Sequence, residues 1–214
     1  MNNLIPGLRK FRENVFPHKQ ELFQSLSQGQ APHTLMIACS DSRIDPNLVT
    51  QAEPGEIFLI RNAGNIVPPY GAASSGEEAT IEFAVAGLRV SNIVICGHSK
   101  CGAMAALANH VNLDGLPSVK RWLSNAEATK RRLEGSPRME NLLEVVQENV
   151  LVQADNLRTH PAVSAALQSG QVRIYGWVYN FETGTVSIYD PKLKAYLPSN
   201  KVKEEFVNAE RFAL

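Results

Sequence analysis

The chain has 214 residues, 44% of them hydrophobic, and its 21 basic and 21 acidic residues give a formal net charge of zero. This length and apolar content are sufficient for one domain with a real core. The balanced charge argues against a nucleic-acid-binding protein, which carries a strongly basic surface. No apolar run approaches the ~20 residues that a membrane-spanning helix needs.

The first segment, residues 4–28, has the pattern of an amphipathic helix. Its apolar residues fall mainly three, four or seven positions apart: Leu4, Leu8, Phe11, Val15, Leu22, Phe23 and Leu26. Pro17 predicts a break in this helix, because proline lacks the N–H that a helix interior requires. Since the segment precedes the first predicted strand, we expect an extended N-terminal helical arm over residues 1–30 that packs on a neighbouring subunit.

Beyond the arm, short apolar runs alternate with helical patterns. Runs at 34–39, 56–61 and 92–96 predict strands buried on both faces, and helices are expected over 75–88, 102–109, 117–133, 138–159 and 161–168. Runs at 172–179 and 185–189 predict a hairpin around the turn Glu182-Thr183-Gly184. This alternation predicts an α/β fold with a mainly parallel central sheet and flanking helices. We expect one domain, 1–214, with a catalytic core at 31–190 and a polar C-terminal tail at 191–214.

Two polar motifs follow predicted strands, Cys39-Ser-Asp-Ser-Arg43 and His98-Ser-Lys-Cys101. Because the carboxyl ends of parallel strands meet at one edge of a sheet, these motifs should converge there. Two thiolates and one imidazole, with a fourth position open, are a donor set typical of catalytic zinc. The third cysteine, Cys96, lies inside a predicted strand and is expected to be a buried core thiol.

A carboxylate and a guanidinium follow the first thiolate, at Asp41 and Arg43. Asp41 could accept the proton of a zinc-bound water and orient the resulting hydroxide, or it could ligate zinc itself and close the site. Arg43 can hold the first arrangement with a bidentate ion pair. The amide of Gly102, near a helix start, could stabilise an anionic oxygen or serve only the turn.

Together with Pro54-Gly55-Glu56, Arg61-Asn62-Ala63-Gly64-Asn65 and the stretch 97–103, these motifs resemble the β-class carbonic anhydrases. The resemblance is strongest to the plant, cyanobacterial and cyanate-operon branch, and it covers about residues 4–190. It implies the β-carbonic anhydrase fold and the zinc-dependent, reversible hydration of CO2 to bicarbonate and a proton by attack of zinc-bound hydroxide. It also implies Cys39, His98 and Cys101 as the zinc ligands, with Asp41 and Arg43 as the catalytic dyad.

The same resemblance implies a small substrate pocket shared across a homodimer or a higher homo-oligomer. Its expected lining residues are Gln30, Phe58, Ala63, Phe83 and Gly102. Phe83 stands where plant-like members usually carry a tyrosine, so one pocket hydroxyl is missing. Members with a non-catalytic bicarbonate site build it from Trp, Arg and Tyr, which align with Met36, Arg61 and Tyr179. Because methionine replaces the tryptophan, we expect no such site here.

Other functions remain open at this point. A related enzyme could hydrate CS2 or COS on the same scaffold, and a catalytically silent zinc protein or a redox sensor, losing zinc when Cys39 or Cys101 is oxidised, are further alternatives. The intact Asp41–Arg43 pair argues against a silent site. Three cysteines, an odd number, favour a reducing compartment, and the N-terminal residues lack the pattern of a signal peptide. We therefore expect a cytoplasmic protein.

Overall fold

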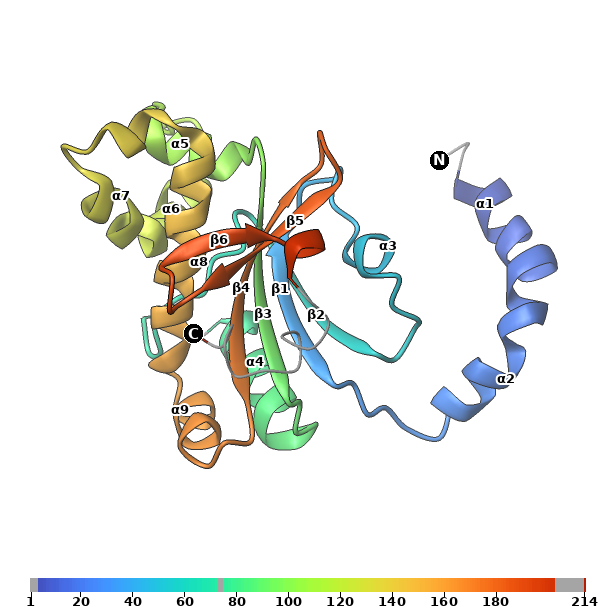
Figure 1. Cartoon of the computed structure of the whole chain (residues 1–214). Helices are drawn as coiled ribbons and strands as arrows, with labels where there is room; N and C mark the ends of the chain where they lie inside the picture. Colours follow the sequence, from blue (N-terminus) through green and yellow to red (C-terminus); the bar gives the residue numbers. More distant parts are fainter. Residues whose placement is uncertain (1–3, 73–74, 203–213) are drawn as a thin grey trace. The chain divides into compact units, whose positions relative to one another are not determined.

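A computed structural model describes residues 4–72, 75–202 and 214 (Figure 1). The chain forms two compact units, residues 1–31 and 32–214. The first unit holds the predicted arm, and the second holds the predicted sheet and both polar motifs.

In the N-terminal unit, residues 4–26 form a nearly continuous helix. It consists of α1 (Leu4–Lys10), a π-helical turn η1 (Phe11–Val15) and α2 (Phe16–Leu26). The predicted break at Pro17 is therefore wrong. Pro17 occupies the second position of α2, where its missing N–H is tolerated, and the π turn just before it keeps the helix going. Three phenylalanines, at 11, 16 and 23, pack against one another with ring centroids 5.6 to 6.2 Å apart.

The second unit is built on a six-stranded mixed sheet with the order β2-β1-β3-β4-β5-β6. Four strands run parallel: β1 (Thr34–Cys39), β2 (Ile57–Asn62), β3 (Asn92–His98) and β4 (Arg173–Asn180). The hairpin strand β5 (Thr185–Asp190) and the edge strand β6 (Ala195–Pro198) are antiparallel. The mainly parallel sheet and the hairpin are confirmed. Strand β6 extends the sheet past residue 190, into the predicted tail, where a four-residue run ending in proline gave no strand signal.

Helices fill the connections between the strands. They are α3 (Pro46–Thr50), α4 (Gly76–Glu82) with the π turn η2 (Phe83–Gly87), α5 (Gly102–Ala108), α6 (Pro117–Leu123), α7 (Glu127–Leu133), α8 (Leu142–Arg158) and α9 (Pro161–Gln168). Short 3-10 turns are η3 (Ser124–Ala126), η4 (Pro137–Glu140) and η5 (Ser199–Lys201). The single helix expected over 117–133 is thus divided by η3, and α3, only five residues long, was not predicted. No helix within the described ranges is long and apolar enough to cross a bilayer.

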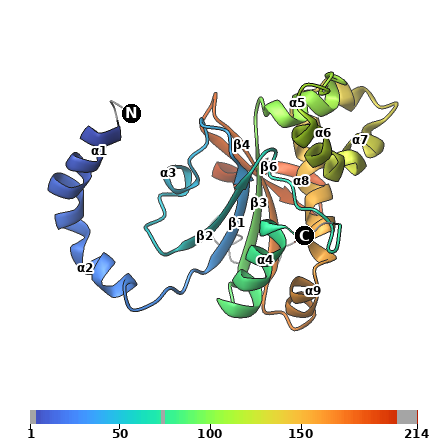
Figure 2. The same cartoon turned by 180° about the vertical axis from the view of Figure 1, so that it is seen from behind.

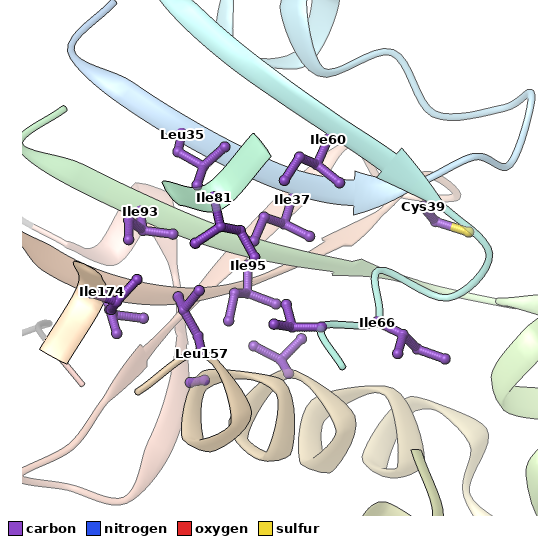
Figure 3. Close-up of a cluster of buried hydrophobic side chains, with 14 of the residues drawn as sticks. Leu35, Ile37, Cys39, Ile60, Ile66, Ile81, Ile93, Ile95, Leu157 and Ile174 are labelled. Atoms are coloured by element: carbon purple, nitrogen blue, oxygen red, sulfur yellow. The ribbon is translucent and has the colours of Figure 1, made fainter. Parts of the chain in front are cut away.

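The main core lies between the sheet and helices α4 and α8 (Figures 1 and 2). Figure 3 shows aliphatic side chains from β1, β3 and β4 packed against Ile81 of α4 and Leu157 of α8. Gly97 lets α8 approach the end of β3, because a Cβ there would lie 2.7 Å from Cγ1 of Val146. At the carboxyl end of β1 the cluster ends on the sulfur of Cys39 (Figure 3), so a tightly packed core supports the edge of the sheet that carries the polar motifs.

Candidate metal centre and active site

Three potential metal ligands meet at the carboxyl edge of the sheet. Cys39 is the last residue of β1, His98 is the last residue of the neighbouring parallel strand β3, and Cys101 immediately precedes α5. One ligand atom from each residue lies within 4.8 Å of the other two. All three residues are buried, with exposures of 6%, 1% and 1%. The structure therefore brings together the three residues that were expected to meet at the carboxyl ends of the strands.

The ring of His98 is oriented as a ligand requires. Its Nδ1 lies 2.8 Å from the carbonyl oxygen of Ser99, and because a carbonyl can only accept, Nδ1 carries the proton. The lone pair is then on Nε2, which is buried and has no hydrogen-bond partner within the described part of the chain. Leaving a buried acceptor unpaired is costly. A cation between Nε2 and the two sulfurs would remove that cost, so the site fits a metal.

The two thiols are close enough to interact directly. A hydrogen bond with Cys101 is the largest of several contacts that lower the pKa of Cys39, and the same contact, with burial, raises the pKa of Cys101. The backbone N–H of Gly64 also donates to Sγ of Cys39, at 3.4 Å. The two sulfurs are thus close enough to share one set of contacts. Two thiolates and an imidazole are donors that suit zinc.

A carboxylate held by an arginine lies beside this group. Asp41 Oδ2 is 4.0 Å from Nε2 of His98, yet it accepts from Nη2 of Arg43 at 2.6 Å. Arg43 Nη2 also donates to the Lys100 carbonyl at 3.2 Å, and its guanidinium lies 4.6 Å from the ring centroid of Phe181. Hydrogen bonds from Arg43 keep the pKa of Asp41 well below its usual range. Two roles were considered for Asp41, orienting a zinc-bound hydroxide and ligating zinc itself. This arrangement favours the first.

Arg61 supports the loop that carries Asp41, a contact that the sequence did not suggest. Its side chain donates to the carbonyl oxygens of Cys39 at 3.1 Å, Asp41 at 2.9 Å and Ile44 at 2.8 Å. In the parallel register Arg61 pairs with Ala38, next to the end of β1. A basic residue at the end of a neighbouring parallel strand is the signal that could have identified it.

The expected pocket residues lie in different places. Ala63 and Gly102 directly adjoin the metal group, since Gly64 bonds to Cys39 and Gly102 follows Cys101. Phe58 and Phe83 instead pair with each other, with ring centroids 6.0 Å apart. Phe58 lies four residues before Asn62, which pairs with Cys39, and is therefore roughly 13 Å along the strand from the metal edge. Gln30 belongs to the N-terminal unit, and its place in a pocket stays a prediction.

Comparison with known proteins agrees with this geometry. The sequence model of the carbonic anhydrase family matches residues 34–186, which include both motifs. A carbonic anhydrase from Synechocystis sp. is 48% identical over 212 residues, covering 94% of this chain and 76% of the relative. The structure of the β-carbonic anhydrase CcaA is 46% identical with a TM-score of 0.86, covering 92% of this chain and 91% of that one. The chain belongs to the β-carbonic anhydrase family.

The family assignment agrees with the fold and the enzyme class expected from the motifs. As a carbonic anhydrase the protein is a lyase, and its cyanobacterial relative agrees with the branch indicated by the sequence. A tetrameric β-carbonic anhydrase from the ascomycete Sordaria macrospora also shares the fold, with 29% identity, a TM-score of 0.71 and coverage of 87% of this chain and 92% of that one. The Cys39–His98–Cys101 group is accordingly the candidate metal centre of a β-carbonic anhydrase.

Proposed function

We propose that this enzyme hydrates CO2 reversibly to bicarbonate and a proton, with Zn2+ held by Cys39, His98 and Cys101. The observation that carries the proposal is the buried Nε2 of His98, which has no hydrogen-bond partner among the described residues and lies within 4.8 Å of two sulfurs. Zinc bound there supplies the Lewis acidity that turns water into a nucleophile near neutral pH.

Asp41 has the properties of an orienting group. Its Oδ2 lies 4.0 Å from His98 Nε2 and would offer a hydrogen-bond acceptor to the attacking water. Because Arg43 holds the pKa of Asp41 below its usual range, Asp41 stays a carboxylate at neutral pH. It can therefore aim the nucleophile, but it is a poor carrier for the proton that the reaction releases, which must pass to solvent or buffer.

CO2 is apolar and needs an apolar pocket rather than a charged one. In the same chain Phe58 lies near the start of β2, far from Cys39, and Phe83 of η2, which contacts Phe58, is 50% exposed. We assign these two rings to the pocket of a second subunit, while Ala63 and Gly102 line the pocket of their own chain. This arrangement makes each complete site a product of two chains.

The N-terminal arm supports a homodimer or larger homo-oligomer. None of the described residues in its helices is buried, and Leu4, Leu8 and Phe11 are among the exposed apolar side chains. An apolar helix face of this kind needs a partner. The tetrameric relative from Sordaria macrospora supports the same conclusion. We propose that the chain is a single domain in which the arm serves assembly and the core over residues 31–190 serves catalysis.

All three cysteines are free thiols, which supports a reducing compartment such as the cytoplasm. The deciding experiment on activity is stopped-flow CO2 hydration with the full chain at mildly alkaline pH, as purified, after chelation and after zinc is restored. We expect a fast rate that chelation abolishes and zinc recovers. A folded, zinc-loaded sample without CO2 hydration would contradict the proposal, and assays with CS2 and COS would then separate a related hydrolase from a silent zinc protein.

A further inference from the structure

One peptide group connects a distant tryptophan to a candidate zinc ligand. The indole Nε1 of Trp122, in α6, donates to the carbonyl oxygen of Ala63 at 2.8 Å. The N–H of Gly64, in the same peptide group, donates to Sγ of Cys39 at 3.4 Å. A planar trans peptide directs its C=O and N–H to opposite sides. Fixing the carbonyl of Ala63 on the indole therefore aims the N–H of Gly64 at the sulfur.

The backbone conformation of Gly64 makes its orientation dependent on hydrogen bonds. Its φ is +82°, a conformation that L side chains rarely adopt, and a Cβ there would lie 3.0 Å from the Cβ of Ala103. No side chain at residue 64 can therefore anchor the loop. Its orientation depends on hydrogen bonds to its two peptide groups.

The second of these peptide groups is anchored from α8. The carbonyl oxygen of Gly64 accepts from Nδ2 of Asn149 at 3.1 Å, and Asn149 is 1% exposed. The Oδ1 of Asn149 accepts from Thr129 of α7 at 3.1 Å and from Gln153 at 2.9 Å, which fixes which end of the amide faces Gly64. Helices α6, α7 and α8 thus hold Gly64 from both sides.

We propose that Trp122 is a positioning residue of the metal centre, which aims and polarises the Gly64 N–H at the Cys39 thiolate. The inference rests on the proposed function, because it requires a metal on Cys39. A hydrogen bond to a ligating sulfur withdraws electron density from it and restricts its movement, and outer contacts of this kind tune metal affinity. Polarisation passes through the peptide because hydrogen bonds in a chain strengthen one another.

The chain contains its own control for this idea. Of its two tryptophans, Trp177 lies in β4 and packs with Met36, Ala38, Val94 and Cys96 in a cluster separate from the main core. Its buried Nε1 has no hydrogen-bond partner among the described residues. Trp122→Phe and Trp177→Phe therefore remove the same atoms, but only the first removes a hydrogen bond.

The experiment measures metal release rather than turnover. Zinc-loaded wild type, Trp122→Phe and Trp177→Phe are mixed with a chromophoric chelator at one fixed pH, and the half-life of zinc transfer is recorded. We expect roughly 10-fold faster release from Trp122→Phe, and release within about twofold of wild type from Trp177→Phe. In the Co2+-substituted proteins, the thiolate-to-cobalt charge-transfer band should move to lower energy in Trp122→Phe alone, because its sulfur has become more electron-rich.

Equal release rates and identical cobalt bands in the two variants would overturn the inference. If Trp122→Phe does not fold by circular dichroism, benzothienylalanine at position 122 replaces the indole N–H with sulfur in a ring of almost the same shape, and the same two readouts decide. A wild-type protein that folds but binds neither zinc nor cobalt at these residues would overturn the proposed function itself. A metal-binding wild type with an unaffected Trp122 variant would overturn only the role of Trp122.

Discussion

Arg43 holds Asp41 in a bidentate ion pair, with Nε donating to Oδ1 at 2.9 Å and Nη2 donating to Oδ2 at 2.6 Å. The backbone N–H of Arg43 also donates to Oδ1, at 3.0 Å. Three hydrogen bonds thus fix both carboxylate oxygens within one tight turn. The carboxylate is held next to the Cys39–His98–Cys101 group without belonging to it, so in the proposed mechanism Asp41 orients the nucleophile and does not bind the metal.

This separation predicts that Asp41→Asn retains metal but loses turnover. The amide keeps the shape of the carboxylate but has only one acceptor oxygen and disrupts the paired contact with Arg43. We expect kcat/KM for CO2 hydration to fall by about 100-fold or more, with one zinc per chain by elemental analysis. Asp114→Asn is the control, because Asp114 pairs with Lys120 at 2.7 Å in the surface loop after α5. Near-normal turnover in Asp41→Asn would refute the orienting role.

The ligand assignment predicts different results for two cysteines. Cys101→Ser should lose zinc and activity, because a serine hydroxyl is a poor substitute for a thiolate ligand. Cys96→Ser should keep both, since Cys96 lies in the smaller cluster with Met36, Ala38 and Val94. Burial raises the pKa of Cys96 to about 12, so it remains a neutral thiol. Zinc content of the two purified variants is the measurement, and full zinc occupancy in Cys101→Ser contradicts the assignment.

The sequence predicted the ligand group because its physical causes are local. Apolar runs mark where β1 and β3 lie, and parallel packing places their carboxyl ends at one edge, so Cys39 and His98 had to meet. The supporting contacts of the site have no local pattern. Trp122 reaches Ala63 across 59 residues, and Asn149 reaches Gly64 across 85. Such contacts depend on how the helices pack, and local sequence patterns do not predict that packing.

The misplaced elements have equally specific causes. Pro17 suggested a helix end, yet a π turn and a position at the start of α2 accommodate it. The helix expected over 117–133 is interrupted at Ser124–Ala126, where a 3-10 turn forms between α6 and α7. Strand β6 has four residues and gains its stability from pairing with β5 rather than from its own sequence.

The contacts of Arg61 predict that the initial rate depends on bicarbonate without cooperativity. In relatives with a non-catalytic bicarbonate site, the residue aligned with Arg61 helps to form it. Here the guanidinium donates to three backbone carbonyls, and Met36 replaces the tryptophan. We expect initial rates to follow a hyperbolic dependence on bicarbonate in the dehydration direction. Strongly cooperative inhibition by bicarbonate would show that an additional anion site exists.

Tyr196 predicts a loss of stability at alkaline pH. Burial, followed by the nearby Tyr189, Glu148 and Cys96, raises its pKa well above the usual 10, and its hydroxyl donates to the Gln147 carbonyl at 2.9 Å. A raised pKa means that the folded state favours the neutral phenol. The contribution of Tyr196 to the free energy of unfolding is therefore complete below pH 10. It is lost as the pH rises further, by up to about 1.4 kcal/mol per pH unit.

Tyr196→Phe tests this expectation through the pH dependence of urea unfolding. At pH 7 the variant should lose about 1 kcal/mol with its hydrogen bond. Above pH 10 its free energy of unfolding should decline less steeply than that of wild type, because phenylalanine cannot ionise. Tyr70→Phe, at a residue that is 50% exposed, is the matched control. Parallel pH profiles for wild type and Tyr196→Phe would contradict the assignment.

The arm predicts that assembly and activity are lost together. Leu8 is 68% exposed in an apolar row that also includes Leu4 and Phe11, and a charge in this row should be costly once a second subunit covers it. Leu8→Asp should therefore form smaller assemblies in sedimentation velocity, with a concentration-dependent loss of CO2 hydration. Gln20→Asp adds the same charge at an exposed polar position of α2 and should match wild type in both assays. Because the proposed ligands Cys39, His98 and Cys101 come from one chain, the smaller Leu8→Asp assemblies should still bind zinc. An unchanged assembly would show that the arm does not contribute to the interface. Full activity in isolated single chains would refute a pocket built from two subunits.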